Sequence, residues 1–123
     1  MKKVLITCGR LEIEAELFDT KTAKLIINET PLSGTTSIWG GEIYFPVSVV
    51  AELEEDATEE VEGGTLAYWP PGKAFCIFFG PTPVSSTSKP RAYSPVNVIG
   101  KIHANLEDLQ SISQDEPIKV ELI

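Results

Sequence analysis

The chain has 123 residues, 42% of them hydrophobic, and carries 18 acidic against 10 basic side chains, for a formal net charge of -8. This length supports one hydrophobic core and is short for two, so we expect a single domain spanning residues 1–123. The negative charge would repel a phosphate backbone or an anionic membrane, which argues against nucleic acid and membrane partners. Acidic residues soon follow the basic first residues and no run of about 20 apolar residues could span a bilayer, so we expect a cytoplasmic protein.

The first residues predict a β-hairpin. Residues 3–8 and 11–17 read as two strands, and Gly9 lies at the first central position of the link, as a type II′ turn requires. Apolar residues of the second strand alternate with three glutamates, Glu12, Glu14 and Glu16. This period of two predicts one buried face and one face of carboxylates in water.

A helix and a second hairpin follow. Asp19 or Thr20 is suited to cap a helix over residues 21–29, and Pro31 would end it. The helix is short, so we expect it to pack on a sheet. Residues 35–47 then predict strand, Gly-Gly turn and strand.

The segment from Glu52 to Glu62 is strongly acidic, with seven carboxylates in eleven positions. This composition predicts a mobile, solvated loop or a frayed helical turn. A divalent-cation site is the functional alternative, but the segment lacks the regular Asp/Asn spacing and central glycine of a dedicated calcium loop.

The richest stretch lies between residues 63 and 83. Leu66 to Trp69 predicts a strand, and the apolar run from Ala74 to Phe79 is typical of a strand buried on both faces. Between them, Pro70-Pro71-Gly72 predicts a rigid corner in which Gly72 takes a turn conformation closed to other residues. Trp69 would therefore present its ring at a stiff rim.

The last third predicts a loop, a strand, a helix and a closing strand. Residues 81–95 are rich in Ser, Thr and Pro and predict a long surface loop, whereas 96–102 predicts a strand in which Gly100 marks a bulge or a close backbone approach. Asn105 is suited to cap a short helix, and 118–122 alternates as a strand. Many short strands with two helices indicate a closed or nearly closed β structure.

Three segments resemble the cyclophilin family. Gly-Gly-Thr-Leu-Ala-Tyr at 63–68, followed by Ala-Phe-Cys-Ile-Phe at 74–78, resembles the signature in which Gly-Thr-Leu-Ser-Met-Ala precedes a Gly-Ser-Gln-Phe-Phe-Ile strand. Val-Ile-Gly-Lys-Ile at 98–102 is similar to the family's Val-Phe-Gly-Lys-Val strand, and Thr22-Ala23 resembles the start of its first helix.

A smaller group is more similar still. Segments 39–45, 68–74 and 97–100 together resemble small prokaryotic cyclophilin-like proteins of unknown function, some from thermophiles. The resemblance implies a mostly β fold: a closed eight-stranded cyclophilin-like β-barrel with two short capping helices.

The departures from true cyclophilins concern the catalytic groove. Aligned on the family's Phe-His-Arg segment, the arginine that acts on the proline amide falls on Pro46. The Ala-Asn pair of the groove falls on Trp69 and Pro70, one phenylalanine of the strand falls on Cys76, and the loop tryptophan has no counterpart in 81–95. The resemblance therefore implies the family's scaffold with a differently lined cleft, and weak or no isomerase activity.

Other catalytic chemistry has little support in the sequence. His103 is the only histidine, and no serine or cysteine has an arrangement that sequence can pair with it. Cys8 and Cys76 fall in apolar strand patterns typical of buried, unreactive thiols, and two cysteines with one histidine at wide spacing argue against zinc. Neither Gly-Gly pair opens a helix as a phosphate loop would. We expect no metal, no cofactor and no assigned catalytic residue.

Aromatic residues beside turns are the best candidates for a cleft. In a barrel, strands send alternate residues outwards, so some of the aromatic side chains would line a binding site. The candidate cleft residues are Trp39, Tyr44, Phe45, Trp69, Pro70, Phe75, Cys76 and Asn97. We expect a non-enzymatic module that binds a peptide or a small apolar ligand; a divergent prolyl isomerase, an unrelated hydrolase and a structural role remain alternatives, because fold does not fix function.

Overall fold

The computed structural model describes residues 1–123 and is mostly β. The strands are β1 (Lys2–Cys8), β2 (Leu11–Leu17), β3 (Leu32–Thr35), β4 (Ser37–Trp39), β5 (Glu42–Pro46), β6 (Thr58–Glu60), β7 (Thr65–Trp69), β8 (Ala74–Phe78), β9 (Arg91–His103) and β10 (Pro117–Leu122). The helical elements are α1 (Lys21–Glu29) and two 3₁₀ segments, η1 (Pro70–Gly72) and η2 (Leu106–Ser111). None of the helices is both long enough and apolar enough to cross a membrane.

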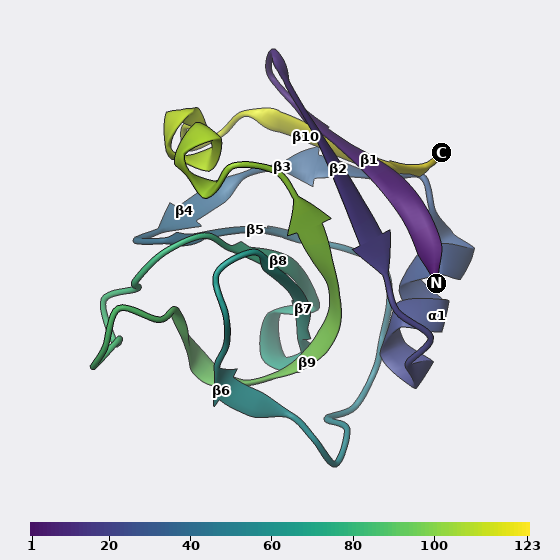
Figure 1. Cartoon of the computed structure of the whole chain (residues 1–123). Coiled ribbons are helices and arrows are strands. Elements are labelled where there is room, and N and C mark those ends of the chain that lie inside the picture. The colour runs from purple at the N-terminus through teal and green to yellow at the C-terminus, as the bar shows by residue number, and fades with distance from the viewer.

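The prediction of a closed eight-stranded barrel is wrong. Nine strands form one curled, open antiparallel sheet in the order β3-β10-β1-β2-β9-β7-β8-β5-β4, and β6 pairs with β9 beside this path. The two end strands, β3 and β4, do not pair with each other. Figure 1 shows α1 and η2 on opposite sides of the curled sheet, where the capping helices were expected, although η2 is a 3₁₀ segment.

Hydrogen bonds to Thr36 explain why the sheet stays open. This residue lies between β3 and β4, and its N–H donates to the Glu116 carbonyl at 2.9 Å while its hydroxyl donates to the Ser113 carbonyl at 2.7 Å. The next strand is held in the same way, because the Ile38 N–H donates to Gln114 Oε1 at 2.8 Å. The loop before β10 therefore satisfies backbone groups that a closed barrel would pair between strands.

The predicted first hairpin and helix are confirmed, whereas strand β3 between the helix and the second hairpin was not predicted. Gly9 has a φ of +59° in the β1–β2 turn, and α1 covers the predicted residues with Thr20 as its cap, whose hydroxyl accepts from the Ala23 N–H at 3.1 Å. Buried residues of α1 include Ala23 and Ile26, which pack into the main core. The short helix is thus stabilised by the sheet it covers.

The central strands are buried on both faces, and this places the site. Successive side chains of a strand point to opposite faces, so Phe75 and Ile77 of β8 join the main core while Ala74, Cys76 and Phe78 join a second cluster outside it. All five residues of β8 are buried, as the sequence predicted. The second cluster also contains Val61, Ala67, Ala92 and Val96. The outer face of the sheet thus carries an apolar layer of its own.

Strand β9 begins earlier than predicted. It starts at Arg91, inside the stretch expected to be surface loop, and pairs with β2, β6 and β7. The Gly100 prediction is confirmed, because the β7–β9 register shifts between Leu66 and Ala67, and a Cβ on Gly100 would lie 2.1 Å from the Glu16 carbonyl oxygen. The glycine lets β9 approach β2 closely enough to pair.

The acidic segment contains no helix: it has one turn, in which the Ala57 N–H donates to the Glu54 carbonyl at 3.1 Å, and then strand β6. Asn97, 1% exposed, holds its start: the side-chain amide donates to the Glu52 carbonyl at 2.8 Å and to Thr22 Oγ1 at 3.0 Å, and accepts from the Glu54 N–H at 2.8 Å. Whether the segment is mobile stays a prediction.

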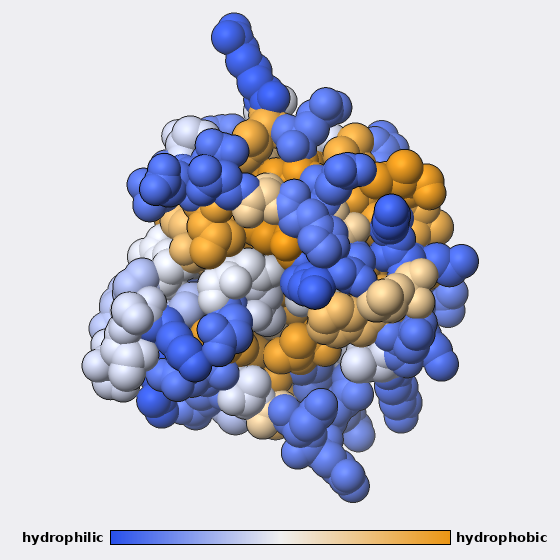
Figure 2. All heavy atoms as spheres, viewed as in Figure 1, coloured by the Kyte–Doolittle hydropathy of each residue, from blue (hydrophilic) through white to orange (hydrophobic).

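Figure 2 shows the molecule from the same side as Figure 1, with hydrophilic side chains covering much of the surface and apolar atoms visible between them.

Candidate functional site

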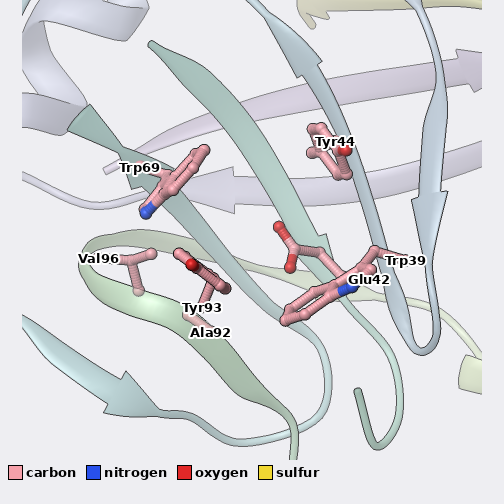
Figure 3. A pocket seen from close by; sticks show the side chains of 7 residues that line it. All are labelled: Trp39, Glu42, Tyr44, Trp69, Ala92, Tyr93 and Val96. Carbon is pink, nitrogen blue, oxygen red and sulfur yellow. The ribbon is translucent and has the colours of Figure 1, made fainter. Parts of the chain in front are cut away.

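A pocket of about 300 Å³ lies on the second apolar layer, outside the main core. Seven side chains line it: Trp39, Glu42, Tyr44, Trp69, Ala92, Tyr93 and Val96. Figure 3 shows that they come from both sides of the pocket, with the β4–β5 hairpin on one side and β7 and β9 on the other. Its volume is at the small end of the range for small-molecule sites, about 300 to 1,000 Å³.

The β4–β5 hairpin supplies one wall because of its register. Trp39 pairs with Glu42 and Glu42 with Phe78, so these residues share the outer face of the sheet. Tyr44 follows two positions after Glu42 and lies on the same face, whereas Ile43 and Phe45 point into the main core. The alternation of a single short strand thus separates core residues from pocket residues.

Trp69 forms the opposite wall and is fixed in place. Its indole Nε1 donates to Ser94 Oγ at 2.7 Å, and its ring covers Gly72, where an added Cβ would lie 2.7 Å from the ring. The expected conformation of Gly72 is wrong: the left-handed residue of the corner is Lys73, with a φ of +49°. The glycine is needed here because it leaves space for the indole, not because of its φ.

Tyr93 stands between the two tryptophans. Its ring lies 6.3 Å from that of Trp39 at an interplanar angle of 70°, and 6.3 Å from that of Trp69 at 87°. Both are edge-to-face arrangements, which aromatic pairs favour. Tyr93 is 72% exposed, so this wall of the pocket is in contact with solvent. The rings of Trp39, Trp69 and Tyr93 thus surround the opening of the pocket.

Glu42 is the one charged side chain of the pocket. It is 7% exposed, and none of the protein's ion pairs includes it. Burial raises the pKa of its carboxyl group to about 7, and interaction with the Cys76 thiol opposes this shift. Burial and the nearby Glu42 charge raise the pKa of Cys76 in turn, so this thiol stays protonated at neutral pH. Figure 3 shows the Glu42 carboxyl group extending between the aromatic side chains.

The structure brings together three of the eight candidate cleft residues. Trp39, Tyr44 and Trp69 line the pocket, and Cys76 lies beneath it in the second cluster. The other four are elsewhere: Phe45 and Phe75 stack in the main core with ring centroids 5.4 Å apart, Asn97 bonds the acidic segment, and Pro70 belongs to the η1 corner.

Four pocket residues were not predicted. Ala92 and Tyr93 fall at the start of β9, inside residues 81–95, which the Ser, Thr and Pro content predicts as a surface loop, and Val96 is the first residue of the predicted strand. The signal for the first two is an alanine and a tyrosine side by side in an otherwise polar stretch. Glu42 follows the Gly-Gly turn, and its alternation with Ile43 places it beside Tyr44 on one face of β5.

Chemistry away from the pocket is limited. His103 Nε2 lies 2.9 Å from Glu16 Oε1 on the surface, and no nucleophile is bonded to it. Both cysteines are buried and free, and burial together with Glu116 raises the pKa of Cys8 to about 11. No group of three or more His, Cys, Asp or Glu side chains is arranged to hold a metal ion.

Comparison with known proteins gives a family and no activity. The solution structure of the hypothetical protein AF2241 from Archaeoglobus fulgidus is similar at 39% identity and a TM-score of 0.83, over 99% of this chain and 95% of that one. McbB, solved in complex with tryptophan, shares the fold at 13% identity and a TM-score of 0.71, over 96% of this chain and 44% of that one. No curated protein matches. The model of the family described as Cyclophilin-like matches residues 2–121, and the chain therefore belongs to that family.

Proposed function

We propose that this protein is a binding module whose ligand, a small molecule or a peptide side chain, enters the aromatic pocket on the outer face of the sheet. The observation that carries the proposal is the gathering of four aromatic side chains, including both tryptophans of the chain, around one open pocket. Aromatic side chains in a concave site with few polar groups are typical of ligand pockets.

The lining of the pocket favours binding over catalysis. Its ionisable groups are Glu42 and two phenols, and neither a histidine nor a serine is among them. The cyclophilin arginine has no substitute nearby: Pro46 ends β5, and Arg91, whose guanidinium lies 2.6 Å from Glu59, is held in an ion pair. Glu42 could serve as a base, but the lining has no serine, cysteine, threonine or lysine to act as a nucleophile beside it.

The two tryptophans make the test direct, because any ligand in the pocket must change their surroundings. We would screen small metabolites and proline peptides by amide chemical-shift perturbation, with tryptophan fluorescence as the second readout. Ligands should perturb residues of β4, β5 and the start of β9. The Tyr93→Ala variant should weaken binding, because it removes a ring from the wall.

Val84→Ala provides the matched control. Val84 is also an exposed apolar side chain, 42% exposed, but it lies in the loop before β9 and does not line the pocket. The control should bind as the unmodified protein does. Perturbations that cluster away from the pocket, or an absence of perturbation by every compound at millimolar concentration, would overturn the proposal.

A further inference from the structure

We propose that the pocket takes a positively charged organic group, an amine or an N-methylated ammonium, which pairs with Glu42 between the aromatic rings. The inference rests on the proposed function, since it names the class of ligand for the same pocket. Three independent features carry it: a buried carboxylate without a counter-ion, aromatic faces around it, and the absence of basic side chains from the lining.

The first feature is Glu42 itself. More than nine-tenths of this residue is buried, what remains faces the pocket, and no Lys, Arg or His lies within ion-pair distance of it. A buried charge is costly unless it is paired. A neutral ligand would remove the last solvent from the carboxylate and increase that cost. A cation forms an ion pair with the carboxylate, and this pair is stronger where water is excluded, so the burial that weakens the binding of a neutral ligand strengthens that of a cation.

The second feature is the set of aromatic faces. The Trp39 and Trp69 rings each lie 6.3 Å from that of Tyr93, at 70° and 87°. Trp39 lies beside Glu42, and Tyr44 lines the pocket farther along β5. Rings set nearly at right angles surround a space on several sides, and each face carries the negative end of a quadrupole that attracts a cation. Such walls are typical of sites that bind quaternary ammonium groups.

The third feature is the charge around the pocket. The chain has a formal net charge of -8. Arg91, the first residue of β9 and the neighbour of Ala92 in the pocket, forms an ion pair with Glu59 at 2.6 Å. The field of the protein therefore attracts cations towards the pocket and repels carboxylate or phosphate ligands. An anionic ligand would also meet Glu42 without any basic group to offset it.

The test compares two probes of the same shape. Choline carries a permanent positive charge, and 3,3-dimethylbutan-1-ol replaces its nitrogen with carbon, so the pair differs in charge alone. At pH 8, titration by calorimetry or tryptophan fluorescence should show choline binding at least about tenfold more tightly than the alcohol. In Glu42→Gln this preference should fall to within about threefold, while the alcohol binds at least as well as before.

The outcomes separate the two proposals. If the alcohol binds as tightly as choline, the cation proposal is wrong and the binding function stands. If neither probe binds and the screen described above also finds no ligand, the binding function itself fails. If other compounds bind at the pocket but choline does not, only the cation proposal is overturned.

The unmodified protein gives a second measurement in case the Glu42→Gln variant does not fold. Choline has no titratable group, so a weaker affinity as the pH falls from 8 to 5 would report protonation of the protein. Three other ionisable groups face Glu42: the phenols of Tyr44 on β5 and Tyr93 on β9, and the Cys76 thiol on β8. Glu42 is the one carboxyl group in the pocket. Choline affinity that is independent of pH would contradict the role of Glu42.

The source of the cation is distinguished by a third probe. A short neutral peptide with one trimethyl-lysine presents the same ammonium group on a longer chain, and the same peptide with norleucine is its uncharged control. Tighter binding of the charged peptide than of choline would identify a protein side chain as the ligand, whereas equal or weaker binding would indicate a free small amine. Binding of the norleucine peptide as tightly as the trimethyl-lysine peptide would overturn the proposal.

Discussion

Replacing Glu42 with glutamine should make the protein more stable at alkaline pH. Burial raises the pKa of this carboxyl group in the folded state to about 7, against an ordinary value of 4.5. The folded state therefore holds the proton more tightly than the unfolded state. The stability that this proton provides is present below about pH 4.5 and is lost as the pH rises through about 7.

The difference between the two pKa values gives the magnitude. A shift from 4.5 to about 7 corresponds to about 3 kcal/mol of unfolding free energy at pH 8. Glutamine has nearly the same shape and cannot ionise, so the variant escapes this loss. Its stability relative to the unmodified protein should increase by about 3 kcal/mol between pH 4 and pH 8.

Urea denaturation of both proteins at several pH values measures this difference, and comparing the two removes the contribution of the other carboxyl groups. Glu12→Gln is the matched control, because Glu12 lies on the exposed face of β2 and should show no such increase. If the stability difference does not change with pH, or if Glu12→Gln shows the same change, then burial does not raise the pKa of Glu42 in the folded protein. A ligand that pairs with Glu42 would recover the lost stability, which links this measurement to binding.

Three other variants or assays test the structure more widely. Trp69→Ala should cost well under the roughly 3 to 5 kcal/mol expected for a buried aromatic residue, because the ring is partly exposed, and a melting experiment that shows the full penalty would assign it to the core. Gly100→Ala should cost more than about 2 kcal/mol, since its Cβ would lie 2.1 Å from the Glu16 carbonyl oxygen, whereas Gly80→Ala, with no contact below 3.9 Å, should cost little. In a protease-coupled assay we expect less than about one per cent of ordinary cyclophilin turnover, because Pro46 replaces the arginine that acts on the proline amide; turnover comparable to a true cyclophilin would refute this.

Local features of the fold could be predicted because they depend on neighbouring residues. The α1 helix needs only a polar cap, an apolar stripe and a proline after its end, and the β8 strand needs only a continuous apolar run. Closure of the sheet was predicted wrongly because it depends on contacts between distant segments. Nothing in the sequence around Thr36 shows that its hydrogen bonds go to the loop at 113–116.

The site was predicted in part for a similar reason. Trp39, Tyr44 and Trp69 could be selected because each lies beside a turn, and turn residues reach the edge of a sheet. Phe45 and Phe75 could not be separated from them by composition, since an aromatic residue suits either face of a strand that is buried on both faces. The register between β5 and β8 decides which face each side chain takes, and it places both in the main core.

The strand order constrains how the chain can fold. β1 lies between β2 and β10, with Val4 opposite Leu122 in the final register, and β3 has β10 as its only strand partner. Figure 1 shows the two termini on the same side of the molecule. Until β10 has been synthesised, β1 therefore has one unpaired edge and β3 has no strand partner at all. Pairing between such distant segments is slow, because the entropy of loop closure is lost before the stabilising contacts form. The sheet should thus be completed only once β10 has been synthesised, and until then the free edges of β1 and β3 are open to pairing with other chains.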